Sequence, residues 1–188
     1  TKSDRVSELN SCDFIFISHN HPDHLHKQTL SYVRKDMNFL VPAFSSNSAG
    51  IYLEDLDFKN IFQTKFGSEY KIKNTNMFFS IFKSGDFRED SGIYFSIGNF
   101  RGLIDVDSNN INFLKIPNVD FYASSLGGIA SGFPLMFENY NLAQKKDIIK
   151  TSNKFQMSQK KLRIIKSKTK YFMPYAGFSS HVLTRDSM

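Results

Sequence analysis

The fold is decided by the stretch Phe14-Ile15-Phe16-Ile17-Ser18-His19-Asn20-His21-Pro22-Asp23-His24-Leu25-His26. Four of the five histidines of the chain lie within eight residues here, with a carboxylate among them. The β-branched and aromatic run before them predicts a strand. The polar residues that follow therefore predict a metal site at the carboxyl end of that strand.

The spacing of the histidines explains how they can bind metal. His19 and His21 lie two residues apart, so on an extended chain both imidazoles point the same way and can hold one cation. Asp23 and His24 follow on a turn, where they can face a second cation. Imidazole with carboxylate suits Zn, Fe, Ni or Mn better than Ca or Mg, and paired metals commonly activate water. The alternatives are a surface histidine cluster that binds nothing and a tag remnant, although a tag is an unspaced run.

The composition favours one domain over residues 1–188. This length is enough for a core, and the 20 Phe and 8 Tyr predict an interior dominated by ring packing. The single cysteine, Cys12, excludes an internal disulfide framework and favours a reducing compartment. No apolar run approaches the roughly 20 residues of a membrane span, and no signal-peptide pattern opens the chain. We therefore expect a cytoplasmic protein with no membrane partner.

The net charge of +6 is concentrated in one part of the chain. A basic balance can indicate a nucleic-acid or phosphate partner. We interpret this stretch as a solvated helix face in preference to a binding surface, and do not expect a nucleic-acid partner. The basic residues of the stretch are Lys145, Lys146, Lys150, Lys154, Lys160, Lys161, Arg163, Lys166, Lys168 and Lys170.

Hydrophobic periodicity predicts alternating elements after the histidine motif. A β-α-β unit is expected first, from the strand at 14–17 through a helix at 27–35 to a strand at 38–42. A hairpin is expected at 92–107, turning at Gly98-Asn99. The helical stretch at 142–168 is expected as one helix or as two broken near 151–153. Further strands are expected at 61–64, 70–73, 77–82, 119–123 and 170–174, and a helix at 51–56.

A carboxylate that could bridge two metals is expected after a hydrophobic strand. Asp105 and Asp107 are the candidates, and strand alternation would direct both to the same side; a simple turn with Ser108 is the alternative. Asp86, Glu89 and Asp90 form another acidic group, for which we expect solvation. The distant His181 is a further ligand candidate after the last strand.

The motif His19-Asn20-His21-Pro22-Asp23-His24 resembles the H-x-H-x-D-H signature of the metallo-β-lactamase superfamily. Later segments resemble, in order, parts of the catalytic domain of CMP-N-acetylneuraminate hydroxylases and their bacterial relatives. The resemblance covers most of the chain from Phe14 onward. Its segments are 85–92, 105–107, 130–135 and 174–178.

This resemblance implies an α/β (α+β) fold, a metallo-β-lactamase-like αββα sandwich that lacks its amino-terminal strands and is a partial domain. It also implies one or two Zn or Fe ions, with Asp107 as bridging carboxylate and Asp23 orienting water or relaying a proton. Superfamily hydrolases usually have another histidine before the bridging Asp, where this chain has Phe87 and could use Asp86. The implied metal ligands are His19, His21, Asp23, His24, Asp107 and His181.

We expect a hydrolase-type enzyme whose metal-activated water attacks a small anionic substrate. The alternative is an iron-dependent oxygenase that hydroxylates a nucleotide sugar. A Rieske cluster needs two Cys and two His, so electrons would come from an external Rieske or reductase component. A catalytically silent or nucleic-acid-binding module is the third alternative. Loops at the mouth of the site are expected to contribute the substrate-binding residues Ser131, Gly132, Phe133, Tyr175 and Phe178.

Overall fold

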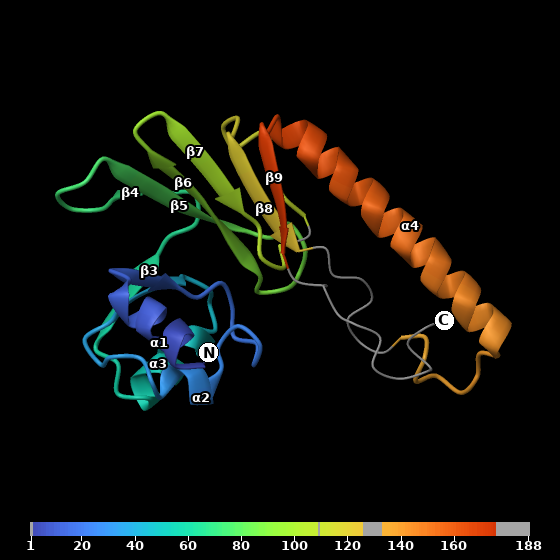
Figure 1. Cartoon of the computed structure of the whole chain (residues 1–188), viewed down its shortest axis with the longest axis horizontal. Helices are drawn as coiled ribbons and strands as arrows, with labels where there is room; N and C mark the ends of the chain where they lie inside the picture. The colour runs from blue at the N-terminus through green and yellow to red at the C-terminus, as the bar shows by residue number, and fades with distance from the viewer. Residues whose placement is uncertain (1, 109, 126–132, 176–188) are drawn as a thin grey trace. The chain divides into compact units, whose positions relative to one another are not determined.

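The computed structural model describes residues 2–108, 110–125 and 133–175. The chain divides into two compact units, and Figure 1 labels their helices and strands. Unit 1 comprises Thr1–Asn99 and Asp105–Asn112, and unit 2 comprises Phe100–Ile104 and Phe113–Met188. The single partial domain that the sequence predicts stays a prediction.

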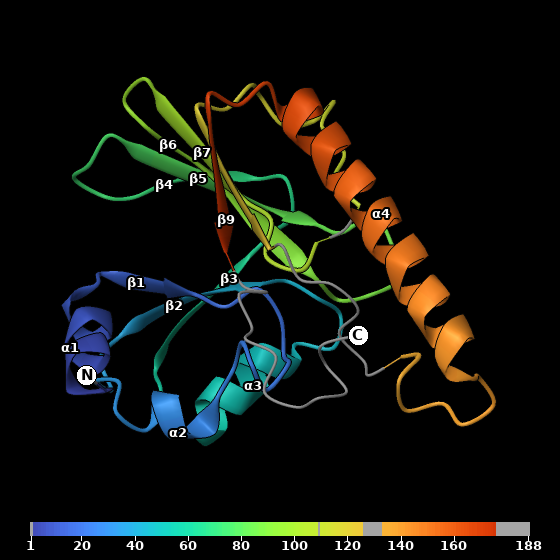
Figure 2. The ribbon, with the colours of Figure 1, turned by 45° about the vertical axis from the view of Figure 1, so that its right-hand side comes forward.

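Unit 1 begins with a parallel three-stranded sheet in the order β1-β2-β3. The register pairs Phe14 with Asn38 and Asn38 with Asn60. Short helices α2 and α3 lie on one face of this sheet (Figure 2). The elements are α1 (Lys2–Ser11), β1 (Phe14–Phe16), α2 (Lys27–Leu30), β2 (Asn38–Pro42), α3 (Ser48–Asp55) and β3 (Asn60–Thr64). The predicted β-α-β unit is therefore present, with a shorter helix than expected.

The core of unit 1 lies between this sheet and its helices. Phe39 and Phe58 are 0% and 1% exposed, and their ring centroids lie 4.7 Å apart. The other buried members of this core are Ile17, Leu25, Leu30, Val33, Met37, Val41, Ala49 and Leu53. The predicted dominance of ring packing is therefore wrong for this core, because most of its side chains are aliphatic.

An antiparallel set of strands completes unit 1. β4 (Glu69–Lys71), β5 (Met77–Lys83) and β6 (Ser91–Ile97) are adjacent in that order. Tyr70 pairs with Phe79, which pairs with Phe95. The segment between β5 and β6 and the turn after Ile104 both contribute polar side chains to the site.

The described residues of unit 2 form three parallel strands and one long helix. β8 (Phe121–Ser125) pairs with both β7 (Phe100–Ile104) and β9 (Tyr171–Tyr175). α4 (Leu142–Ser167) is continuous, and a capping box joins Asn141 to Gln144 at its start. The predicted break at 151–153 is absent, because Thr, Ser and Asn cost well under about 1 kcal/mol each in a helix and no Pro or Gly interrupts it.

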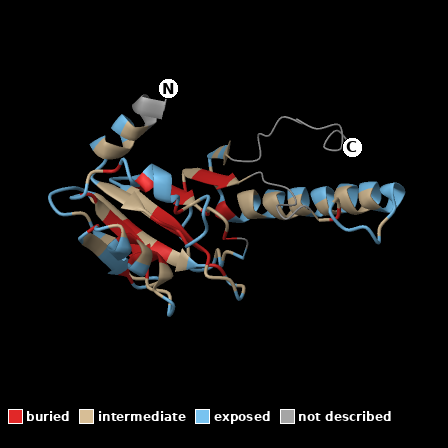
Figure 3. Cartoon of the chain, turned by 90° about the horizontal axis from the view of Figure 1, so that it is seen from below, coloured by how far each residue is buried: buried red, intermediate tan, exposed pale blue. Residues whose placement is uncertain are grey.

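The basic stretch of α4 lies on a largely exposed helix, and its interpretation as a solvated face in preference to a binding surface stays a prediction. Within this helix only Ser167 is buried, and exposed and half-buried residues make up the rest (Figure 3). No helix in the described part of the chain is long and apolar enough to cross a membrane.

Candidate metal centre

The end of β1 carries the first histidine into the protein interior. The N–H of Ile17 donates to the carbonyl of Leu40 at 3.0 Å, so the ladder between β1 and β2 continues beyond β1. Ser18 and His19 follow and are 4% and 2% exposed. Ser18 Oγ lies 2.9 Å from His19 Nδ1, and the Ser91 hydroxyl donates to the carbonyl of Ser18 at 2.6 Å. These contacts hold the imidazole and leave its Nε2 facing the other polar groups.

A tight turn positions the rest of the histidine motif. The N–H groups of His24 and Leu25 both donate to the carbonyl of His21, at 2.9 and 2.8 Å. Leu25 is buried in the core and anchors this turn. His26 instead caps α2, where its side chain accepts a hydrogen bond from the N–H of Thr29. His26 therefore has a local structural contact outside the site.

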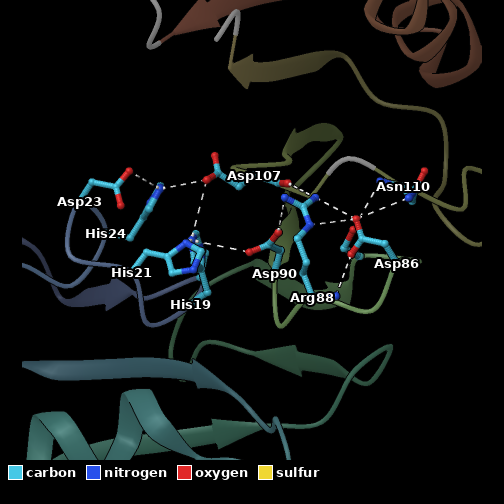
Figure 4. A network of polar contacts seen from close by, with 11 residues as sticks. His19, His21, Asp23, His24, Asp86, Arg88, Asp90, Asp107 and Asn110 are labelled. Atoms are coloured by element: carbon cyan, nitrogen blue, oxygen red, sulfur yellow. Dashed lines mark hydrogen bonds and ion pairs between the residues drawn. The ribbon is translucent and has the colours of Figure 1, made fainter. Parts of the chain in front are cut away.

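Among the described residues, two groups of metal-ligating side chains share His19 (Figure 4). Within each group the ligand atoms lie within 4.8 Å of one another. In the first group, His19 Nε2 lies 2.8 Å from His21 Nδ1 and 3.7 Å from Asp90 Oδ1. In the second, Asp107 Oδ2 lies 3.4 Å from His24 Nε2 and 3.8 Å from His19 Nε2. Each group thus joins two imidazoles and one carboxylate.

Asp23 lies beside the second group. Its Oδ2 is 3.4 Å from His24 Nε2, and its side chain is 77% exposed. The structure therefore brings four of the predicted motif ligands and Asp107 together from separate parts of unit 1. Their role as ligands stays a prediction.

The electrostatic environment keeps the shared histidine ready for a cation. Burial, followed by the neighbouring His24 and His21, lowers the pKa of His19 to about 4, so its imidazole is neutral at pH 7. The hydrogen bond with Asp107 raises the pKa of His24 and lowers the pKa of Asp107. Burial raises the pKa of Asp90.

The charge balance also fits a metal ion. The carboxylates of Asp86 and Asp90 and the backbone carbonyl of Asp107 face the guanidinium of Arg88, while the Asp107 carboxylate faces the histidines (Figure 4). Buried carboxylates are costly unless they are paired or coordinate metal. Negative charge therefore exceeds positive charge beside the neutral imidazole of His19, an arrangement that a divalent cation would neutralise.

The prediction that Asp90 is solvated is wrong. Asp90 is 1% exposed, whereas Glu89 is half-buried and accepts a hydrogen bond from Ser46. The burial of Asp90 could have been inferred from its position directly before β6, a strand that begins with buried residues. Its proximity to His19 had no local signal, because the two residues are far apart in the sequence.

Neither Asp86 nor Phe87 takes the place of the missing histidine. Both oxygens of Asp86 accept hydrogen bonds from Arg88, one from its backbone and one from its guanidinium. Phe87 is 95% exposed. Asp90, in contrast, lies in a ligand group with His19 and His21.

Asp105 and Asp107 do not alternate along a strand as expected. β7 ends at Ile104, Val106 has φ 51°, and the N–H of Ser108 donates to the carbonyl of Asp105 at 2.8 Å. These three features form a turn that separates the two side chains. Asp105 is buried at 0% exposure, and Asp107 is the one beside the histidines.

The remaining predicted residues belong to unit 2 or lie outside the described residues. Phe133 and Tyr175 belong to unit 2, and the ring of Phe133 lies 5.2 Å from that of Phe137. Their substrate-binding role stays a prediction. The predicted residues that lie outside the described part of the chain are Ser131, Gly132, Phe178 and His181.

The sequence is similar to CMP-N-acetylneuraminic acid hydroxylases. The Danio rerio protein is 28% identical over 184 residues, which cover 93% of this chain and 31% of the relative. The Pan troglodytes protein is 30% identical over 190 residues, covering 94% of this chain and 31% of the relative. This chain thus spans about a third of the length of these relatives. No protein-family profile matches it.

Solved structures identify the fold. CmlA, a diiron β-hydroxylase from Streptomyces venezuelae, superposes with a TM-score of 0.65 at 18% identity, covering 89% of this chain and 36% of CmlA. A putative metal-dependent hydrolase from Parabacteroides distasonis gives 0.56 at 14% identity, covering 93% and 70%. The metallo-β-lactamase fold protein YhfI from Bacillus subtilis gives 0.50 at 11% identity, covering 92% and 69%. The chain therefore has the mixed α/β metallo-β-lactamase fold, as predicted.

Proposed function

We propose that unit 1 holds iron and supports the chemistry of an oxygenase. The observation that carries this proposal is the first donor set, because His19 and His21 lie with the carboxylate of Asp90. Two histidines with one carboxylate are the donor set of non-haem iron oxygenases. Asp90 supplies the carboxylate in the first group, instead of the additional histidine expected for a hydrolase of this superfamily. The similarity to hydroxylases supports the same choice.

The residues of the chain have distinct roles in this proposal. His19, His21 and Asp90 would hold one ion, and His24 with Asp23 the other. Asp107 contacts histidines of both groups and would bridge. The bound metal would supply activation of O2, and the exposed carboxylate of Asp23 would move protons between the site and water. His181 is proposed as a further ligand by resemblance alone.

The substrate and the electron source follow from the hydroxylase similarity. We propose a small anionic substrate of the nucleotide-sugar class. Inserting one oxygen atom of O2 into a C–H bond, with the other leaving as water, consumes two electrons and two protons. The chain has one cysteine and so cannot hold a Rieske cluster by itself. An external electron-transfer component would supply the electrons.

Metal analysis of anaerobically purified protein, followed by a turnover assay, tests the proposal. We expect about one or two iron ions per chain, and O2 consumption with a chemical reductant and CMP-N-acetylneuraminate. A product heavier by one oxygen atom, labelled by 18O2, would identify hydroxylation. Protein that binds iron but gives no labelled product with any nucleotide sugar would contradict the oxygenase function.

Hydrolysis is the second candidate, and the solvent-exposed Asp23 beside His24 favours it. An exposed carboxylate next to a paired-metal site can orient an attacking water. The similarity to a putative metal-dependent hydrolase agrees with this alternative. It predicts zinc in the purified protein and an activity that needs neither O2 nor reductant, so the same measurements distinguish the two functions.

A further inference from the structure

Arg88 contacts both acidic residues that the proposed centre takes from outside the histidine motif, Asp90 through its carboxylate and Asp107 through its backbone carbonyl. It belongs to the segment between β5 and β6, and its guanidinium faces three acceptor groups (Figure 4). Nη1 lies 3.2 Å from Asp90 Oδ2. Nη2 donates to Asp86 Oδ2 at 2.8 Å and to the carbonyl of Asp107 at 3.5 Å. Nε also donates to Asp86 Oδ2, at 3.2 Å.

These contacts direct the guanidinium toward the protein. All three of its nitrogens face acceptors within unit 1, although the side chain is 36% exposed. A planar guanidinium holds carboxylates in a fixed orientation, which a lysine ammonium does not do. Arg88 is therefore suited to fixing neighbouring groups in place and poorly suited to binding an incoming anion.

The two carboxylate oxygens of Asp90 face different partners. Oδ2 faces Arg88 at 3.2 Å, and Oδ1 lies 3.7 Å from His19 Nε2. The contact with the Asp107 carbonyl connects the same guanidinium to the turn that carries the second carboxylate. We propose that Arg88 is a positioning residue that sets both Asp90 and Asp107 for metal binding.

The segment that carries Arg88 is itself held in place, as this role requires. The N–H of Ser84 donates to the carbonyl of Asp90, and the N–H of Gly85 donates to the carbonyl of Asn110, both at 2.8 Å. A Cβ on Gly85 would lie 3.1 Å from that Asn110 oxygen, so glycine permits the close approach. Asn110 Nδ2 also donates to Asp86 Oδ2 at 3.5 Å. Asp86, which accepts hydrogen bonds from Arg88, is thus held by Asn110 as well.

The inference rests on the proposed metal centre, and a cobalt titration tests it separately from turnover. Metal-free wild-type protein and the variants Arg88→Gln, Arg88→Lys and Asp86→Asn are titrated with Co(II) against a chromogenic chelator. Visible absorption spectra report the coordination. Arg34→Gln is the matched control, because the Arg34 side chain is also 36% exposed and pairs with Asp36 at 2.9 Å.

We expect Arg88→Gln to weaken Co(II) affinity by about 10- to 100-fold, the usual effect of losing a partner that orients a ligand. Its cobalt spectrum should change as well. Arg88→Lys should recover only part of the affinity, and Asp86→Asn should lie between Arg88→Gln and the wild type. Arg34→Gln should keep the wild-type affinity within about two-fold and the wild-type spectrum.

Two results would overturn the positioning role. One is a wild-type affinity and spectrum in Arg88→Gln, and the other is full recovery in Arg88→Lys, which would show that only the charge matters. If Arg88→Gln fails to fold by circular dichroism, Arg88→Lys and Asp86→Asn decide the question. Wild-type protein that binds no Co(II) would overturn the metal centre itself, whereas Co(II) binding without oxygenase turnover would overturn only the proposed function.

Discussion

Replacement of Asp90 by Asn should increase the free energy of unfolding of the metal-free protein and lower its affinity for metal. Asp90 is 1% exposed, and burial raises its pKa, so its negative charge is costly without a cation. Arg88 offsets part of that cost at 3.2 Å. Asn keeps the shape of the side chain and removes the charge. The same change therefore has opposite effects on stability and on affinity.

The magnitudes follow from the burial of this carboxylate. Because Arg88 keeps its contact with Asp86 at 2.8 Å, we expect the Asn variant to gain about 1 kcal/mol in free energy of unfolding, or roughly 2–4 °C in Tm. Partners that only orient a ligand contribute about 10- to 100-fold. Loss of a direct ligand should therefore cost about 100-fold or more, or about 2.8 kcal/mol.

The pH dependence gives the prediction a sign that can be checked. A raised carboxyl pKa means that the folded state binds the proton more tightly, so wild-type stability falls as pH rises through that pKa. The advantage of Asp90→Asn should be present at pH 7 and absent below about pH 3.8, where the wild-type carboxyl is protonated in both states.

Urea denaturation of the metal-free proteins and Co(II) competition measure the two effects. Asp36→Asn is the control, because this side chain is 76% exposed and pairs with Arg34 at the surface. It should change stability by no more than about 0.5 kcal/mol and leave affinity unaltered. A less stable Asp90→Asn protein that binds metal as the wild type does would refute the reasoning.

Three further predictions follow from the described contacts. In metal-free protein, NMR titration should find the pKa of His24 above 6.5, and Asp107→Asn should lower it. Because the pKa is raised in the folded state, the interaction between His24 and Asp107 stabilises the fold below pH 6.5, and this stabilisation is lost as the pH rises through the raised pKa. His26→Ala should cost about 1 kcal/mol in urea denaturation through loss of the α2 cap and leave Co(II) affinity unchanged, whereas weaker binding would place His26 in the site. Phe58→Ala should cost about 3–5 kcal/mol because its buried ring packs against Phe39, and an unchanged urea midpoint would contradict this.

Several elements of the fold could be predicted from local patterns. The β-branched run at the start of the chain forms β1, and Leu40 with Val41 lies in the buried strand β2. Helix α4 coincides with a long stretch that contains no Pro or Gly. Such elements depend on the spacing and propensity of neighbouring residues, which the sequence contains directly. Whether α4 would be broken depended on small propensity costs that the pattern does not resolve.

The candidate site was only partly predictable for a related reason. His19, His21, Asp23 and His24 are close in the sequence, so their convergence needed only a strand end and a turn. After Ile104 the chain forms the turn with Ser108 that the sequence offered as the alternative to strand alternation, with Val106 at a positive φ.

The sequence by itself determined the histidine motif, the strand that delivers it and the resemblance to a metallo-β-lactamase fold. Only the tertiary structure decided that Asp90 is buried beside His19 and that Arg88 contacts both Asp90 and Asp107. The physical reason is that burial and the separation of charges depend on which distant segments pack together. From the neighbouring sequence Asp90 was expected to be a solvated loop residue, whereas in the folded protein its charge is buried and therefore costly.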